Sequence, residues 1–168
     1  MKKKDCDIVD FTKAGKYKGN RLLLRERVLA GLDQLKQQPD VDQNKLAAIG
    51  YCFGGTTVLE LARSGAPVKG VVSFHGGLSA DPKVEESIKT KILVLHGADD
   101  PFVPPNEVAG FEEEMKTSGA DYRLIKYPGA VHGFTNPNNK GEIPGALYNA
   151  EADAKSWEAM QGFFKEIF

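Results

Sequence analysis

The chain has 168 residues, of which 41% are hydrophobic and 27% charged, and its 22 Lys and Arg against 23 Asp and Glu leave a net charge of −1. This length favours a single domain over residues 1–168, and the balance of apolar and charged residues excludes a mainly disordered chain. No apolar run reaches the roughly 18–20 residues that a membrane-spanning helix needs, and two cysteines are too few for a disulfide framework.

The N-terminal part of the chain is basic, because residues 1–27 hold nine Lys or Arg and four Asp or Glu. These bases are not interleaved with aromatic residues in a nucleic-acid motif, so we expect neither a nucleic-acid nor a membrane partner. The first four residues resemble the start of a signal peptide, but Asp5, Asp7 and Asp10 stand where its apolar stretch should follow. We therefore expect a cytoplasmic protein with reduced thiols.

Residues 1–20 show weak periodicity and contain Gly15 and Gly19, which predicts an arm or loop with at most one helical turn. An amphipathic helix is predicted next, over Arg21 to Gln38, and Pro39 ends it. Its apolar residues recur at spacings of four, four and three: Leu24, Val28, Leu32 and Leu35.

The rest of the chain alternates short apolar runs with amphipathic stretches. The runs are nearly continuous, which is typical of strands buried on both faces of a parallel sheet. The predicted strands are Leu46–Tyr51, Val68–Phe74, Lys91–His96 and Tyr122–Tyr127. The predicted helices are Thr56–Ser64, Val103–Thr117 and Ala150–Ile167, the last with Trp157 on its buried face, and Pro128–Leu147 is a loop. This order predicts an α/β fold with a mostly parallel sheet and flanking helices.

The sharpest local signal is Gly50-Tyr-Cys52-Phe-Gly54-Gly, between a predicted strand and a predicted helix. This is the context of a nucleophile elbow, in which glycines at 50 and 54 permit a close turn around Cys52. The helix N-terminus favours the thiolate of Cys52, and the Phe53 N–H faces a developing oxyanion. The alternative is a buried cysteine in a glycine-rich turn.

Two further candidates follow later strands. Asp99 and Asp100 come after the apolar strand ending at His96, and His132 follows the strand ending at Tyr127. Because the carboxyl ends of parallel strands share one edge, we expect these residues near Cys52, in the chain order nucleophile, acid, histidine. Cys52 then attacks, His132 carries the proton, and Asp100 orients the imidazole.

Each partner has a simpler interpretation. The two aspartates fit a turn before Pro101, and His132 fits an ordinary surface loop. A metal site built from His75, His96, His132 and the two aspartates matches no short ligand motif. Acyl transfer needs neither a metal nor an organic cofactor, so we expect none. His75, Phe102 and Phe134 are candidates for substrate contact.

Together the three segments resemble the dienelactone hydrolase family, whose marks are an elbow Gly-x-Cys-x-Gly-Gly, an acid segment Asp-x-x-Val-Pro and a His-x-Phe. Here these are Gly50–Gly55, Asp100–Pro104 and His132–Phe134. The resemblance covers the chain from about Gly15 onward. It implies an α/β-hydrolase fold with a Cys-Asp-His triad that acts on esters or lactones.

The chain departs from the family pattern in two respects. Asn136 stands where family members that take a carboxylate-bearing lactone have an arginine, which removes a bidentate clamp. The family's N-terminal strands, with the loop that gives a second oxyanion N–H, are missing, so the fold is expected to be shortened at its N-terminus. The Leu46–Tyr51 strand then becomes an edge.

Two hypotheses follow. The first is a hydrolase of small esters or lactones that works through an acyl-cysteine intermediate. The second is a truncated, catalytically weak or inert domain that persists by self-association. An edge at 46–51 has no charge or proline to protect it, so we also predict a homodimer through symmetric pairing of this strand.

Overall fold

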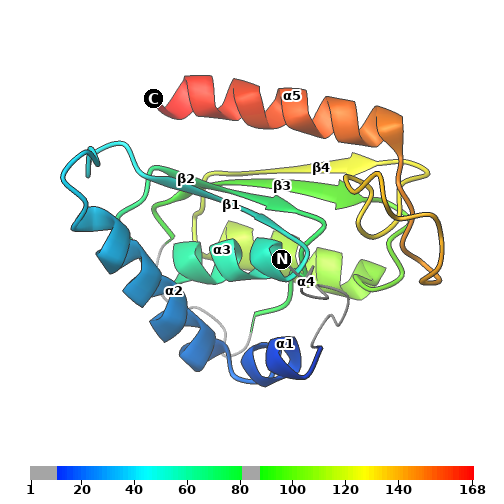
Figure 1. Ribbon diagram of the computed structural model, residues 1–168, viewed down its shortest axis with the longest axis horizontal. Helices are drawn as coiled ribbons and strands as arrows, with labels where there is room; N and C mark the ends of the chain where they lie inside the picture. The colour runs from blue at the N-terminus through cyan, green and yellow to red at the C-terminus, as the bar shows by residue number, and fades with distance from the viewer. Residues whose placement is uncertain (1–10, 81–87) are drawn as a thin grey trace, which may run out of the picture.

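A four-stranded sheet crosses the middle of the computed structural model, which describes residues 11–80 and 88–168 (Figure 1). Its order is β1-β2-β3-β4, and each neighbouring pair runs parallel. The strands are β1 (Ala47–Tyr51), β2 (Gly70–Phe74), β3 (Lys91–Gly97) and β4 (Tyr122–Tyr127). The helices are α1 (Phe11–Lys18), α2 (Arg21–Lys36), α3 (Phe53–Arg63), α4 (Pro105–Thr117) and α5 (Ala150–Ile167). The predicted α/β class is confirmed, and β1 lies at an edge as expected.

Helices cover both faces of the sheet, α5 on one side and α2, α3 and α4 on the other (Figure 1). Alternate strand residues face the two layers: Val71 packs toward α3, whereas its neighbour Val72 packs with Phe163 of α5. Burial on both faces explains why the inner strands read as continuous apolar runs.

The N-terminal arm differs from its prediction. Residues 11–18 form helix α1, whereas we expected a loop with at most one turn; residues 1–10, which include Cys6, lie outside the described residues. Gly15 sits inside the helix, and its carbonyl accepts from the Gly19 N–H at 2.9 Å. The Tyr17 ring lies 6.4 Å from the Phe53 ring, so a tertiary contact accompanies a helix that local propensity alone disfavours.

Helix boundaries shift by a few residues from those predicted. α3 begins at Phe53 rather than Thr56, because the turn after β1 leads directly into the helix. The Asn20 side chain caps α2 by accepting from the Leu23 N–H at 3.0 Å. Gly65 follows the end of α3 with φ +71°, a conformation that favours glycine.

None of the helices within residues 11–80 and 88–168 combines the length and the apolar character needed to cross a membrane.

Candidate active site

The site begins at the turn between β1 and α3, where Cys52 has φ 53° and ψ −117°. A positive φ is strained for a residue with a side chain, and such strain concentrates at functional sites. A Cβ on Gly50 would overlap the backbone of Gly54, and a Cβ on Gly55 would lie 2.7 Å from Ser73 Oγ. Our expectation for Gly54 was wrong, because a Cβ there meets nothing within 4 Å. The close turn therefore depends on Gly50 and Gly55.

Three side chains from distant parts of the chain form one line of hydrogen bonds. His132 Nε2 lies 3.1 Å from Cys52 Sγ, and His132 Nδ1 lies 2.9 Å from Asp100 Oδ2. Asp100 is buried, and its other oxygen accepts from the Phe102 N–H at 2.8 Å. The structure thus brings together the nucleophile, base and acid candidates that the sequence indicated.

The loops after β3 and β4, which carry Asp100 and His132, are held against each other. The Asp99 carboxylate accepts from the Gly129 N–H at 3.0 Å and so ties the two loops together. A Cβ on Gly97 would lie 2.6 Å from the Ala130 carbonyl, so the loops pack closely. Asp99 therefore has a structural contact of its own, and Asp100 is the carboxylate that reaches His132.

The hydrogen bonds favour a thiolate–imidazolium pair. The hydrogen bond from His132 is the main influence that lowers the pKa of Cys52; burial opposes it, and the Phe53 N–H and the charge of Lys18 add to it. Burial alone would lower the pKa of His132, but its hydrogen bonds to Asp100 and Cys52 raise that pKa to about 9. An imidazolium beside a thiolate is the activated form of a cysteine nucleophile.

The three candidates for substrate contact have different environments. The Phe102 ring is 51% exposed and lies edge-on to the His132 ring at 5.1 Å. Phe134 is fully buried against His75 and Tyr127, so the expectation that it contacts substrate was wrong. Its aromatic ring instead fills the core beneath the site. His75 is 4% exposed and bonds to the Cys52 backbone N–H.

A cavity of about 870 Å³ opens over Cys52 and His132. Large apolar side chains make much of its wall: Tyr51, Phe102, Ile143 and Trp157. Of these four residues, Phe102 was predicted from the sequence to contact substrate. Trp157 was expected on the buried face of α5 but is 49% exposed, because the buried positions there are Ala152, Ser156, Met160 and Phe163.

The charged groups of this wall include Lys18, at the end of α1, and Asp153. Asn136, at the position of the family arginine, also lines the cavity. Arg123 is not among the lining residues; it pairs with Glu166 on α5 at 2.8 Å. Lys18 was missed because the arm was expected to be irregular, and no sequence signal placed it over the elbow.

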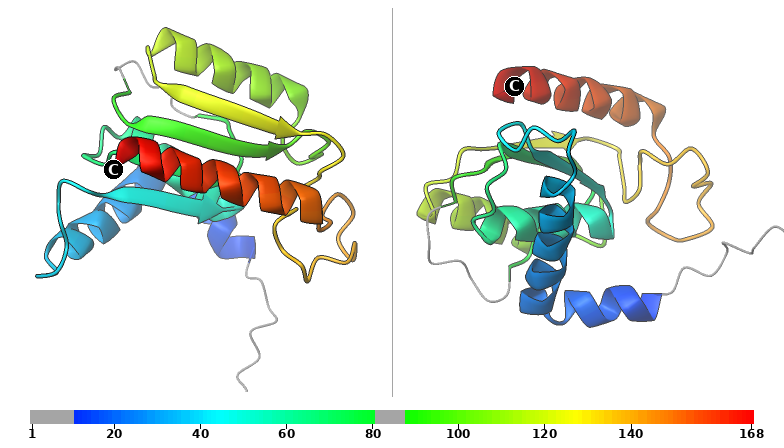
Figure 2. Two further views of the ribbon diagram at one scale, coloured as in Figure 1. Left: turned by 90° about the horizontal axis from the view of Figure 1, so that it is seen from above. Right: turned by 60° about the vertical axis from the view of Figure 1, so that its left-hand side comes forward.

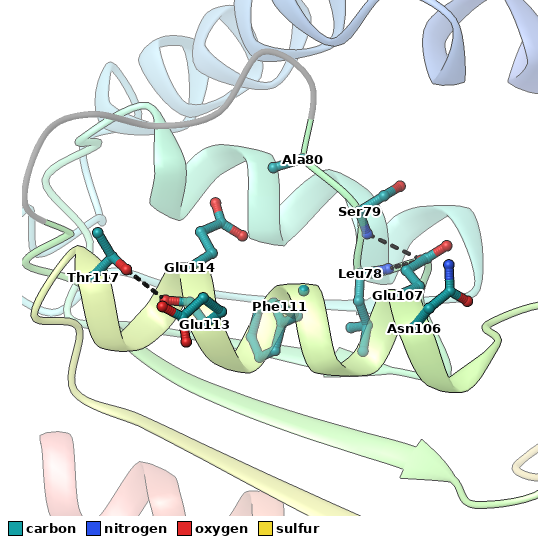
Figure 3. A pocket seen from close by; sticks show the side chains of 10 residues that line it. Leu78, Ser79, Ala80, Asn106, Glu107, Phe111, Glu113, Glu114 and Thr117 are labelled. Carbon is teal, nitrogen blue, oxygen red and sulfur yellow. Dashed lines mark hydrogen bonds between the residues drawn. The ribbon is translucent and has the colours of Figure 1, made fainter.

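A second cavity, of about 440 Å³, lies between α4 and the segment from Leu78 to Ala80 (Figure 3). Glu107 accepts there from the N–H groups of Leu78 and Ser79, at 2.6 and 3.0 Å. Glu114 bonds to Arg63, at 2.6 Å. Both carboxylates are thus engaged in holding the fold together.

No group of three or more His, Cys, Asp or Glu side chains within the described ranges is arranged to hold a metal ion. His96 is buried at the end of β3, and its Nδ1 has no hydrogen-bond partner there.

Comparison with known proteins places this site in a family context. The sequence profile described as "Dienelactone hydrolase family" matches residues 4–168. An uncharacterized protein of Caenorhabditis elegans is 38% identical over 149 residues, which cover 86% of this chain and 94% of that protein. A carboxymethylenebutenolidase homolog of Xenopus tropicalis is 29% identical over 114 residues, which cover 67% of this chain and 45% of that one.

Among solved structures, this chain is similar to a dienelactone hydrolase-like promiscuous phosphotriesterase from metagenomic libraries. The two superpose with a TM-score of 0.88 at 43% identity, over 94% of this chain and 66% of the other. The chain therefore spans nearly all of the worm protein but only part of the length of the other two.

Proposed function

The chain belongs to the dienelactone hydrolase family, and from this premise we propose that it hydrolyses small carboxylic esters or lactones through a Cys52–His132–Asp100 triad. The observation that carries the proposal is the pair of contacts at His132, 3.1 Å to Cys52 Sγ and 2.9 Å to Asp100 Oδ2. A nucleophile bonded to a base that is oriented by a third group is the arrangement that covalent acyl transfer requires.

In the acylation step, the Cys52 thiolate attacks the carbonyl carbon and a C–S bond forms. The carbonyl oxygen becomes an oxyanion, and we expect the Phe53 N–H to donate to it. The tetrahedral intermediate collapses as the C–O bond to the leaving alcohol breaks, and His132 Nε2 gives its proton to the departing oxygen. An acyl-cysteine thioester and neutral His132 remain.

In the deacylation step, neutral His132 takes a proton from water as the water oxygen attacks the thioester. The C–S bond breaks, the carboxylic acid leaves, and the thiolate–imidazolium pair is restored. Asp100 stabilises the imidazolium through its hydrogen bond to His132 Nδ1. The step needs a reduced thiol, so the proposal places the enzyme in a reducing compartment such as the cytoplasm.

A weakly active or inert domain is the second candidate. The chain spans 66% of the similar phosphotriesterase structure, so the activity of that protein is not carried over to this chain by similarity alone. Loss of one oxyanion donor typically costs about 10²–10³ in turnover, so a site with Phe53 N–H as its one donor would retain slow hydrolysis. Absolute turnover therefore separates the two candidates, whereas dependence on Cys52 is common to any residual activity.

The test is hydrolysis of p-nitrophenyl acetate by the wild-type chain and by Cys52→Ala, with Cys6→Ser as the matched control. We expect slow hydrolysis that Cys52→Ala abolishes and Cys6→Ser preserves, and an acetyl group on Cys52 in mass spectra of the quenched reaction. Equal rates for wild type and Cys52→Ala would exclude the acyl-cysteine mechanism.

The cavity wall bears on substrate choice. With Asn136 in place of an arginine clamp, a carboxylate-bearing dienelactone should not be strongly preferred over a neutral ester of similar size. Comparing kcat/KM for the two substrates, with wild type and Lys18→Gln, measures this directly. A large dienelactone preference that Lys18→Gln removes would assign the clamp to Lys18.

We also propose that the chain forms a homodimer through β1. The Leu46 carbonyl accepts from the Lys69 N–H just before β2, and the Cys52 N–H donates to the Phe74 carbonyl at the end of β2. The backbone alternation therefore directs the N–H and C=O groups of Ala47, Ile49 and Tyr51 outward. α5 lies over β2 and β3 and leaves β1 to one side (Figure 2). Ile49 and Tyr51 are accordingly 46% and 40% exposed.

A twofold axis at Ile49 suits antiparallel pairing of two such strands. It opposes Ile49 to Ile49 of the partner subunit and Ala47 to Tyr51 of the partner subunit, which matches small with large side chains. All of these residues point their backbone groups outward, so each opposed pair exchanges both of its hydrogen bonds.

Sedimentation at micromolar concentration tests the dimer, together with hydrogen exchange of the Ala47, Ile49 and Tyr51 amides. We expect a dimer in which these amides become more protected as concentration rises. A monomer at every concentration would exclude pairing through β1 and leave the catalytic proposal unaffected.

A further inference from the structure

Two strained residues meet at the carboxyl ends of β1 and β2. Among the described residues, Cys52 and His75 are the non-glycine residues with positive φ, at 53° and 39°. They are joined by a hydrogen bond, because the Cys52 N–H donates to His75 Nδ1 at 3.1 Å while sharing its proton with the Phe74 carbonyl at 3.0 Å. Strained backbone persists where surrounding contacts fix it, most often at functional sites.

The other ring nitrogen of His75 reaches the loop that carries the base. His75 Nε2 lies 2.9 Å from Thr135 Oγ1, and Thr135 follows His132 by three residues. Because Nδ1 must accept from an amide, the ring proton sits on Nε2, which donates to the threonine. The imidazole thus bridges the backbone of Cys52 and the segment that holds His132.

We propose that His75 is a positioning residue: it fixes the backbone of Cys52 relative to the His132 loop and so keeps Sγ within reach of His132 Nε2. This inference rests on the proposed function, because it gives a role in the same site. His75 also supports the base directly, since the two imidazole rings lie edge-on with centroids 5.3 Å apart.

The charge state of His75 agrees with this bridging role. Burial, and then the positive charge of His132, lower the pKa of His75 to about 4, so the ring stays neutral at working pH. A protonated ring would turn an N–H toward the Cys52 N–H and lose the bond. Both nitrogens are engaged and the residue is 4% exposed, so His75 lines the cavity without a free polar atom to offer a substrate.

The test compares three replacements of His75 in a Cys6→Ser background, with the pH dependence of Cys52 alkylation by iodoacetamide as the readout. His75→Asn keeps a polar atom near the Nδ1 position, His75→Gln keeps one near Nε2, and His75→Phe keeps ring volume without either. Thermal unfolding of each variant measures the purely structural contribution separately.

We expect His75→Phe and His75→Gln to slow alkylation at pH 7 by about tenfold and to move its onset to higher pH, since loss of alignment weakens the thiolate–imidazolium pair. His75→Asn should stay within about threefold of wild type. Thr135→Val should slow alkylation less than His75→Phe does. Thr135→Ser keeps the hydroxyl and should leave the alkylation rate at the wild-type value. His96→Asn, at the other buried strand-end histidine, controls for the loss of a buried imidazole.

A wild-type pH profile for His75→Phe would overturn the inference. If that variant does not fold, the Asn and Gln variants decide, because equal alkylation rates for these two would also overturn it. Alkylation does not require ester turnover, so an inert chain that still shows the His75 effect would contradict the proposed function alone.

Discussion

Strand β1 borders two regions that differ sharply. At its carboxyl end lies the hydrogen-bonded turn at Cys52, and along its outer side lies an edge of the sheet. At the carboxyl end of β1, the backbone of Cys52 is strained, and its N–H and its thiol are both hydrogen-bonded. Along the outer side of β1, the backbone groups of Ala47, Ile49 and Tyr51 face away from the sheet, and apolar side chains are exposed.

The opposite edge of the sheet shows how such a side is usually protected. β4 presents Arg123 and Lys126, which pair with Glu166 and Glu112 at 2.8 and 3.3 Å. Charged side chains on an edge discourage pairing with another strand. This contrast is the reason why the proposed dimer uses the β1 edge and not the β4 edge.

The largest effect should come from the constrained end. Gly50→Ala places a Cβ into the backbone of Gly54, so we expect it to lower the free energy of unfolding by about 3 kcal/mol. Gly54→Ala has open space at its Cβ and should change it by less than about 0.5 kcal/mol. Urea denaturation of the two variants measures the difference, and equal losses would contradict a tight turn at Gly50.

The open side should respond to charge and leave the end of the strand intact. In the proposed dimer, Ile49→Lys sets two like charges against each other at the twofold axis, and we expect the dimer dissociation constant to rise at least about 100-fold. Ile49→Val should leave it within a few-fold. Sedimentation gives both values. Iodoacetamide alkylation of Cys52 should be the same in both variants, and a parallel loss of alkylation would show that the two regions are coupled.

The electrostatics of the constrained end can be shifted without breaking it. Hydrogen bonds to Asp100 and Cys52 hold the pKa of His132 at about 9, so the imidazolium that stabilises the thiolate is present below that pH and lost above it. Asp100→Asn removes part of this influence. The pKa of His132 then falls, so the imidazolium is lost at a lower pH and stabilises the thiolate less. The onset of alkylation should therefore move up by about one pH unit.

Asp99→Asn is the matched control for that shift, because Asp99 bonds to the Gly129 N–H and not to His132. Its alkylation profile should match wild type. An identical shift in both variants would mean that general negative charge, rather than the Asp100–His132 hydrogen bond, sets the pKa.

The smallest effect is expected at the closed edge. Arg123→Ala removes an exposed ion pair with Glu166, and such pairs contribute about 0–1 kcal/mol, so unfolding should change by less than about 0.5 kcal/mol. The affinity of the proposed dimer should also stay unchanged. A stronger dimer or higher oligomers would show that charge on β4 is what keeps the second edge unpaired.

Much of the fold was predictable because its signals are local. Apolar residues at spacings of three and four identified α2, and continuous apolar runs identified the strands, since each pattern reports which faces an element buries. The site was predictable in part for the same reason. The glycines of the elbow motif themselves indicate a tight turn. Asp100 and His132 each follow a strand whose end can be recognised in the sequence.

The sequence by itself determined the α/β class, the elbow at Cys52 and the order of the three candidate residues, because these depend on short-range periodicity and on glycines in one turn. Only the tertiary structure decided which distant groups meet: His132 reaches Cys52 across 80 residues and Asp100 across 32. It also made residues 11–18 a helix beside the site, exposed Trp157 and buried Phe134. Such contacts depend on strand order and loop packing, which no local pattern encodes.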